Sequence, residues 1–334
     1  MLSDLPIEII KHEIFRYLDY SGKIVLSNVL WYTPIPKVLE CNIQKEICKY
    51  SISYLTFFAS LLSSQLLPMY LSIHCNFAGL KWSKANQYPS SDWTPDQAAL
   101  KGNLEILKWA HENEYRFTTS TFARAAENGN LDVVKWLRSI LCPWNKEASI
   151  SASRSGNLEV LKWITENGCP IDNTMCGYAA YGGYLEVIKW SRGKGVPWDE
   201  QTCAYAAVGG NLEILKWLIE NGCPWDNSAC EFAALHGKLE VVKWLREKGC
   251  KWNANISEFA ASGGNLEVLK WLRKNGCPWD KTTCEGAAHN GHLEVIKWAR
   301  ENGCPWDKET VISAGKGENV ELVNWLIENG CPYQ

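Results

Sequence analysis

A tryptophan recurs every 27 residues along most of this 334-residue chain. The series consists of Trp82, Trp109, Trp136, Trp163, Trp190, Trp217, Trp244, Trp271, Trp298 and Trp325. A pair of small residues keeps the same interval, as Ala206-Ala207 and Ala287-Ala288 illustrate. Such an interval is typical of stacked repeats, because one short unit cannot bury its apolar face alone and is covered by the next unit. The chain is therefore expected to fold as an array of nine clear units and a degenerate tenth.

Each unit contains one stretch with the pattern of an amphipathic helix. In residues 266–275 the apolar positions fall on one side of a helix, whereas Glu267 and Lys270 fall on the other side. Asn265 is expected to cap this helix at its start, and Gly276 is expected to end it in a left-handed conformation. Every unit thus has one helix with a buried face.

A shorter helix is predicted in each unit around the alanine pair. Residues 283–289 form such a stretch, in which Ala287-Ala288 would let a neighbouring helix approach closely. The sequence CPWD at residues 277–280 predicts a turn between units, since proline fixes the backbone and tryptophan covers the helix ends. The predicted fold class is all-α, an α-solenoid of about nine to ten helix-pair repeats.

The repeated motif AA-x-x-G-N/H-L-E-V-L/V-K-W-L is similar to the ankyrin repeat, whose second helix carries GHLEVVKLLL and whose first carries TPLHLAA. The resemblance covers about residues 92 to 334. The family's usual unit has about 33 residues, so these 27-residue units lack the segment from which ankyrin repeats project a hairpin finger. Short, tryptophan-rich units of this kind resemble the ankyrin arrays of giant DNA viruses and some protists. The resemblance implies a protein that binds other proteins.

The residue that follows the alanine pair varies from unit to unit and resembles the groove-facing position of the ankyrin family. These positions are Leu100, Glu127, Arg154, Tyr181, Val208, Leu235, Ser262, His289 and Lys316. The resemblance implies that they contact a protein target. Their middle run, Tyr181, Val208 and Leu235, is apolar between charged ends, which suits a target with an apolar anchor and a polar rim.

Four aromatic residues precede the alanine pair in consecutive units, namely Tyr178, Tyr205, Phe232 and Phe259. They are expected to stack along one line of the solenoid. The corresponding ankyrin position is the core leucine of LAA, so core packing is favoured. A platform for a ligand is the alternative.

The N-terminal segment has a resemblance of its own. Residues 2–32, LSDLPIEIIKHEIFRYLDYSGKIVLSNVLWY, place apolar residues at helical spacings and predict a small bundle of short helices. The segment resembles the F-box, which docks on the Skp adaptor of cullin-RING ubiquitin ligases, although residues 11–13 stand where that family has two residues. The resemblance implies that the docking face or its support consists of Leu5, Pro6, Ile9, Ile10, Ile14, Leu18 and Val29. The alternative is an apolar bundle that caps the solenoid.

These patterns divide the chain into three parts. Residues 1–45 are predicted to form the F-box-like helical module, residues 46–91 a helical linker with the degenerate first repeat, and residues 92–334 the ankyrin-type solenoid. Residues 51–75 contain no Asp, Glu, Lys or Arg, so a membrane span is an alternative for this part of the linker. Six serines, Gln65 and Pro68 favour a buried linker instead.

The composition argues against several classes of function. The net charge of -3 is spread along the chain, so we expect no basic face for nucleic acid. The 14 cysteines lack a C-x-x-C knuckle and accompanying histidines, so free packing cysteines are expected rather than metal ligands. The sequence offers no combination of nucleophile, acid and base, so we expect neither an enzyme nor a cofactor. The chain start lacks the pattern of a signal peptide, which favours the cytoplasm, the host cytoplasm if the protein is viral, or the nucleus.

Together these features predict a monomeric adaptor. Its ankyrin-type repeats would bind a target protein, and its F-box-like segment would recruit a Skp/cullin ubiquitin ligase. The alternative is a non-catalytic scaffold or inhibitor, in which the repeats bind a partner and the N-terminal bundle only caps the solenoid.

Overall fold

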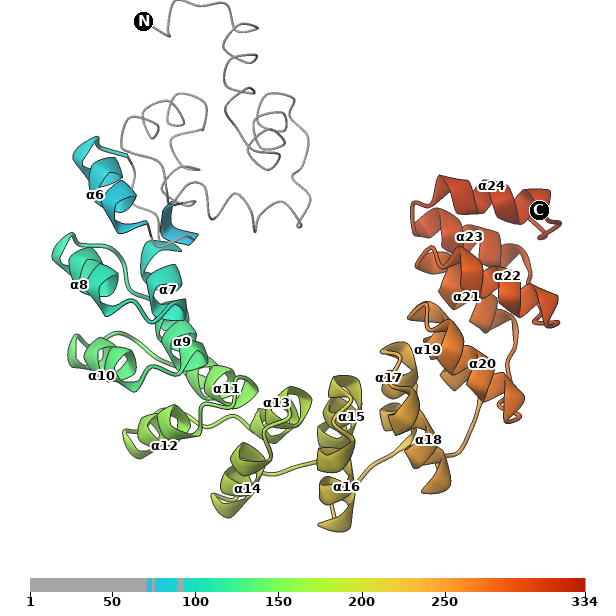
Figure 1. Cartoon of the computed structure of the whole chain (residues 1–334), viewed down its shortest axis with the longest axis horizontal. Coiled ribbons are helices and arrows are strands. Elements are labelled where there is room, and N and C mark those ends of the chain that lie inside the picture. The colour runs from blue at the N-terminus through green and yellow to red at the C-terminus, as the bar shows by residue number, and fades with distance from the viewer. Residues whose placement is uncertain (1–70, 74–75, 89–92, 334) are drawn as a thin grey trace, which may run out of the picture. The chain divides into compact units, whose positions relative to one another are not determined.

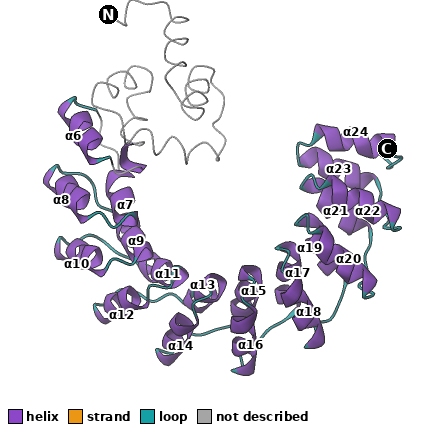
Figure 2. Cartoon of the chain, viewed as in Figure 1, coloured by secondary structure: helices purple, strands orange, loops and turns teal. Residues whose placement is uncertain are grey.

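A computed structural model describes residues 71–73, 76–88 and 93–333 of the chain. This part is helical and contains no strand (Figure 2). The F-box-like module lies outside the described residues, as does most of the uncharged segment at 51–75. The chain divides into two compact units, Met1–Trp144 and Asn145–Gln334, which we call unit 1 and unit 2.

Unit 1 contains the first helix pairs of the array. Its described helices are α6 (Phe77–Ala85), α7 (Trp93–Leu100), α8 (Leu104–Glu112), α9 (Thr119–Asn128) and α10 (Leu131–Ser139). Helix α7 packs on α8 and α9, and α9 packs on α10. Unit 1 thus pairs a first and a second helix in each repeat.

Unit 2 continues the same alternation of helices. They are α11 (Lys146–Arg154), α12 (Leu158–Glu166), α13 (Met175–Gly182), α14 (Leu185–Gly193), α15 (Glu200–Gly209), α16 (Leu212–Glu220), α17 (Asn227–Leu235), α18 (Leu239–Glu247), α19 (Ala254–Ser262), α20 (Leu266–Lys274), α21 (Lys281–His289), α22 (Leu293–Glu301), α23 (Lys308–Lys316) and α24 (Val320–Glu328). The odd-numbered first helices pack side by side in one layer, and each also packs on the second helix of its own repeat (Figure 1). The predicted all-α solenoid of helix pairs is thereby confirmed.

The helix boundaries agree with the expected signals, with one extension. Helix α20 runs from Leu266 to Lys274, and Gly276 beyond it has the left-handed φ of 82°. Helix α21 begins earlier than predicted, because the Asp280 side chain accepts a hydrogen bond from the Thr282 backbone N–H and caps the helix. The turn aspartate therefore defines the start of the first helix.

The core lies between the two layers of helices. In α15 the pair Ala206 and Ala207 is fully buried, and in α16 the side chains of Leu215 and Leu218 are fully buried too. Alanine leaves little side chain between neighbouring first helices, so the helices can approach closely, as the sequence predicted. The same pair is buried in α13, α17, α19 and α21.

An arginine and two tryptophans form a cluster that joins adjacent repeats and that we call the Arg–Trp–Trp stack, in which the two rings meet edge to face. The ring centre of Trp279, in the turn after α20, lies 5.8 Å from that of Trp298 in α22. The Arg273 guanidinium lies 4.4 Å from the Trp279 ring centre. Both rings are half-buried and cover a core cluster that contains Cys284 and Cys304. The same arrangement recurs as Arg192–Trp198–Trp217, Arg246–Trp252–Trp271 and Arg300–Trp306–Trp325.

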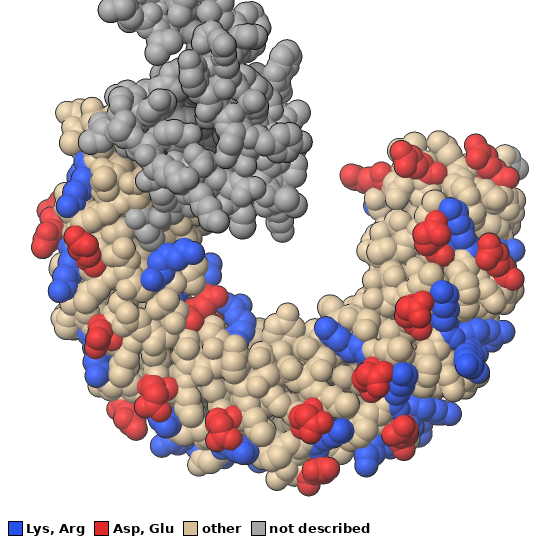
Figure 3. Space-filling view, viewed as in Figure 1, with Lys and Arg blue, Asp and Glu red and all other residues tan. Residues whose placement is uncertain are grey.

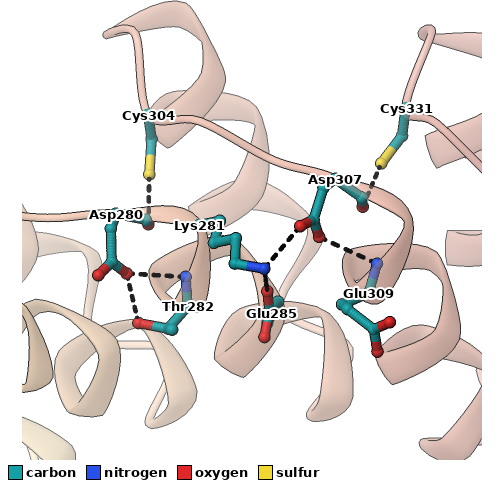
Figure 4. Close-up of polar contacts among 8 residues, drawn as sticks. All are labelled: Asp280, Lys281, Thr282, Glu285, Cys304, Asp307, Glu309 and Cys331. Atoms are coloured by element: carbon teal, nitrogen blue, oxygen red, sulfur yellow. Dashed lines mark hydrogen bonds and ion pairs between the residues drawn. The ribbon is translucent and has the colours of Figure 1, made fainter.

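The turn cysteines join the end of each repeat to its beginning. The Cys304 thiol lies 3.3 Å from the backbone carbonyl of Asp280, and Cys331 lies 3.3 Å from that of Asp307 (Figure 4). All cysteines in the described part are buried free thiols, as expected. Cysteines 20 residues apart lie in contact with each other, as Cys284 and Cys304 do.

Three side-chain-bearing residues of the described part occupy the turn position that glycine takes in the later repeats. Gln87, Glu114 and Leu141 have φ values of 60°, 59° and 58°, in the left-handed region like the 82° of Gly276. The turns of these early units therefore keep the left-handed backbone despite the steric cost of a Cβ atom.

Candidate protein-binding face

Each first helix of unit 2 leaves one side uncovered. In α17 the buried side chains are Ala229, Cys230, Ala233 and Ala234. These residues lie on one half of the helix, toward the second helices and the neighbouring first helices. The opposite halves of α11, α13, α15, α17, α19, α21 and α23 form what we call the variable face. In the view of Figure 3, charged side chains gather over α14, α16 and α18 rather than along the edge formed by α13 and α15.

The structure places all nine predicted groove residues at the last or next-to-last position of a first helix. Leu100 and Glu127 belong to unit 1, in α7 and α9. The other seven follow one another on the variable face of unit 2. Exposed side chains belong to Arg154, Tyr181, His289 and Lys316, and half-buried ones to Leu100, Glu127, Val208, Leu235 and Ser262. Their role in binding stays a prediction.

The backbone of this variable position is fixed by the next repeat. The Asn211 amide donates hydrogen bonds to the carbonyls of Ala180 and Tyr181, both at 2.9 Å. Asn265 does the same for Ala234 at 3.0 Å and Leu235 at 2.7 Å. The expectation that Asn265 caps its own helix is therefore wrong, since its side chain makes no such bond. It binds instead the last carbonyls of the first helix in the preceding repeat.

The four aromatic residues lie on the variable face and not in the core. Tyr178, Tyr205, Phe232 and Phe259 are all half-buried, so the sequence interpretation as core packing is wrong. Their rings pack on each other in two pairs: Tyr178 and Tyr205 have centres 5.4 Å apart, and Phe232 and Phe259 have centres 6.1 Å apart. Each ring precedes a predicted groove residue by three positions, which puts the two on the same side of a helix.

A glycine makes room for one of these rings. A Cβ atom on Gly177 in α13 would lie 2.7 Å from the Tyr205 ring, which is closer than real Cβ contacts. The ring therefore lies against the bare backbone of α13. Burial and the adjacent Tyr178 hydroxyl raise the pKa of Tyr205. The side chain is held in place before any partner binds.

A row of glutamates runs beside the aromatic residues, and sequence reasoning missed it. Glu231, Glu258 and Glu285 occupy equivalent positions in α17, α19 and α21, at the 27-residue interval. Burial raises the pKa of Glu231, and the carboxylates of Asp226 and Glu258 raise it further, while hydrogen bonds from asparagines in the next repeat oppose the rise. Alignment of the units would have revealed this row.

The third glutamate has incomplete pairing. Burial raises the pKa of Glu285, Lys281 opposes the rise, and the carboxylates of Asp307, Glu309 and Glu258 add to it. The Lys281 ammonium lies 3.8 Å from Glu285 but donates its hydrogen bond to Asp307 at 2.7 Å (Figure 4). One oxygen of Glu285 is shielded from solvent and has no hydrogen-bond partner.

The described residues contain neither a cluster of metal ligands nor a membrane-spanning helix. In this part of the chain, no three His, Cys, Asp or Glu side chains gather as metal ligands would. Along the described residues, no helix combines the length and the apolar character needed to cross a bilayer. The predicted Skp-docking residues, from Leu5 to Val29, lie outside the described residues.

Comparison with known proteins finds a similarity in the central repeats. Residues 176–256, from α13 into α19, match the family model of ankyrin repeats in three copies. No curated protein matches the chain. The central repeats are thus similar to ankyrin repeats, which serve as scaffolds for protein interaction.

Proposed function

We propose that the protein is an adaptor, in which the variable face of unit 2 binds a target protein and residues 1–45 recruit a Skp-type subunit of a cullin-RING ubiquitin ligase. Target binding is supported by the contrast between a repeated framework and the exposed or half-buried side chains of the variable face, which differ from repeat to repeat in unit 2. The second half is supported by the resemblance of the N-terminal segment to the F-box.

The chemistry of the variable face suits a protein target. Tyr181 exposes 46% of its surface, and Val208 and Leu235 are half-buried at the equivalent positions of the next two repeats. Apolar and aromatic side chains on a rigid surface supply most of the binding energy of protein interfaces when a partner covers them. We place this activity in the cytoplasm or nucleus, or in the host cytoplasm if the protein is viral.

A triple change tests the target-binding half. Replacing Tyr181, Val208 and Leu235 by Ser should abolish binding of protein targets captured by the full chain, and should leave the helical circular dichroism spectrum unchanged. A control triple change on the second helices, at the exposed residues Glu213, Glu240 and Glu267, should retain the targets. Equal capture by the first variant and the wild-type chain would contradict target binding by this face.

A double change tests the recruiting half. Leu5→Ala with Pro6→Ala should eliminate co-purification of a Skp protein from a eukaryotic lysate while the repeats remain folded, because apolar interface contributes roughly 25 cal/mol per Å². If the wild-type chain never co-purifies with Skp, and the double variant instead lowers the melting temperature of the repeats, ligase recruitment is wrong. The non-catalytic scaffold or inhibitor then takes its place. That alternative keeps target binding by the variable face, whose helices α11 to α23 all belong to unit 2.

A further inference from the structure

The middle of the variable face is free of basic residues. Helices α13, α15, α17 and α19 contain no Lys or Arg. Over the same helices lie the two aromatic pairs and the apolar side chains of Val208 and Leu235. Helices α15, α17 and α19 each contain one glutamate, at Glu200, Glu231 and Glu258, and α21 adds Glu285. The surface is therefore both aromatic and acidic.

The glutamate row has little positive charge beside it in the described part of the protein, although asparagines of the next repeat donate hydrogen bonds to Glu231. Lys281 is the basic residue of α21, and its short hydrogen bond is to Asp307 rather than to Glu285. Lys238, from the next repeat, lies beside Gly210 at the C-terminal end of α15. A Cβ atom added to Gly210 would be 2.9 Å from the Lys238 side chain. The glutamates lie in the middle of their helices, away from the helix ends.

Carboxylates beside aromatic rings are the chemistry that recognises cationic side chains. A guanidinium or ammonium group binds a carboxylate through charge-assisted hydrogen bonds and is attracted to the face of an aromatic ring. An apolar residue next to the cation would cover Val208 and Leu235. Such an arrangement also disfavours acidic partners, since like charges brought together on binding are repelled.

We propose that the variable face of α13 to α21 binds a segment of a partner protein that carries Lys or Arg next to an apolar side chain. This inference rests on the proposed function, because it specifies the chemistry of the target that the face selects. The cationic side chains bind the row formed by Glu231, Glu258 and Glu285, and the apolar side chain packs on the aromatic pairs.

Phage-displayed random 16-residue peptides, selected on the full-length chain, provide the probe. We expect the enriched peptides to contain Lys or Arg beside Leu, Phe or a similar residue, and to bind more weakly as salt is added. The selected peptides are then synthesised with a fluorescent label, and their dissociation constants are measured for the wild-type chain and for two matched variants.

The test variant carries Glu231→Gln, Glu258→Gln and Glu285→Gln, which removes the charges and retains the side-chain shapes. The control variant carries Glu240→Gln, Glu267→Gln and Glu294→Gln, which makes the same change of charge on the second helices of the same three repeats. We expect the dissociation constant to rise about tenfold or more in the test variant and to change by less than about twofold in the control.

The outcomes separate this inference from the proposed function. The selected peptides could lack basic residues and lose binding to the variant with Tyr181→Ser, Val208→Ser and Leu235→Ser, but not to the Gln test variant. That result would overturn the inference, while target binding by the variable face would stand. Equal weakening of peptide binding in the test and control variants overturns the inference as well, because the overall negative charge of the protein would then explain the effect. A selection that yields no peptide sensitive to the Ser variant overturns both.

Discussion

The turn side and the variable face of unit 2 differ in how strictly their residues recur. On the turn side, the same Arg–Trp–Trp stack joins α20 to α22, α18 to α20 and α14 to α16, and only small differences in distance separate the copies. On the variable face, equivalent positions hold Tyr181, Val208 and Leu235. Contacts that join repeats must fit the neighbouring repeat and therefore recur, whereas side chains that meet only solvent are free to differ.

Removal of a turn tryptophan should cause the largest loss of stability. Trp279→Ala should lower the free energy of unfolding by about 3 kcal/mol, since it removes the stack with Trp298 and leaves a cavity over the Cys284 and Cys304 cluster. Chemical unfolding followed by circular dichroism measures the change. The three Ser substitutions on the variable face together should cost less than this single one. A larger cost for the Ser variant would show that the variable face is part of the framework.

High pH should weaken the framework because its cysteines are buried. Burial raises the pKa of Cys176 from 9.0 to about 11, although Arg192 opposes the rise. A thiol whose folded pKa is raised gives its full contribution to stability below pH 9, and that contribution is lost as pH rises through the folded pKa. We expect the free energy of unfolding to fall between pH 9 and 11 by on the order of 1 kcal/mol per thiol and pH unit.

A conservative variant isolates this effect. Serine does not titrate in this range, and Ser257 already occupies the equivalent position of α19. Cys176→Ser should therefore make the decline of unfolding free energy with pH less steep, whatever its effect on stability at pH 7. An unchanged slope would assign the loss of stability to other groups.

The turn after α12 lacks the stack, and a double substitution could build one there. Ile171 stands where the turn tryptophan is found elsewhere and is 38% exposed, and Thr165 stands in place of the arginine. Thr165→Arg with Ile171→Trp should build a stack on Trp190 and raise the free energy of unfolding by about 1 to 2 kcal/mol. Thermal unfolding of the double variant and both single variants measures the gain. Additive single effects would indicate that no stack forms.

The smallest effect concerns the backbone of the turns. Leu141→Gly should stabilise the protein by about 1 kcal/mol, because it relieves a side chain at positive φ. Gly276→Ala is the matched reverse change, since no atom lies within 4 Å of the added Cβ and only the backbone strain changes. This change should lower the free energy of unfolding by about 1 kcal/mol.

Hydrogen exchange should also show faster opening around residues 112–120 and 139–145 than around residues 222–280. Uniform protection of these regions from hydrogen exchange would contradict backbone strain at the early turns.

Sequence reasoning located the helices because their signals are local. The 27-residue interval, the buried alanine pair and the turn glycine are each visible within a single unit, and all of them act as expected in α20 and α21. The 27-residue interval also places the predicted groove residues at equivalent positions, at the ends of the first helices. These features require no knowledge of how one repeat contacts the next.

The remaining features depend on contacts between units, which the sequence does not specify. The aromatic row was assigned to the core by analogy with a leucine, but the half-buried Tyr205 lies on the variable face, against Tyr178 and the backbone at Gly177 in the adjacent α13. The carbonyls bound by Asn265 belong to a residue 30 or 31 positions earlier, in the preceding repeat. Its role as a bridge could not be distinguished from that of a helix cap.

The asparagine bridge also bears on how such a protein can change over time. Asn211 and Asn265 bind carbonyl oxygens of Tyr181 and Leu235, atoms that every amino acid possesses. A substitution at either position can thus replace the side chain offered to a partner without loss of the bond that holds the helix end. Mutation can accordingly explore new partners one repeat at a time, while the spacing between repeats is inherited unchanged.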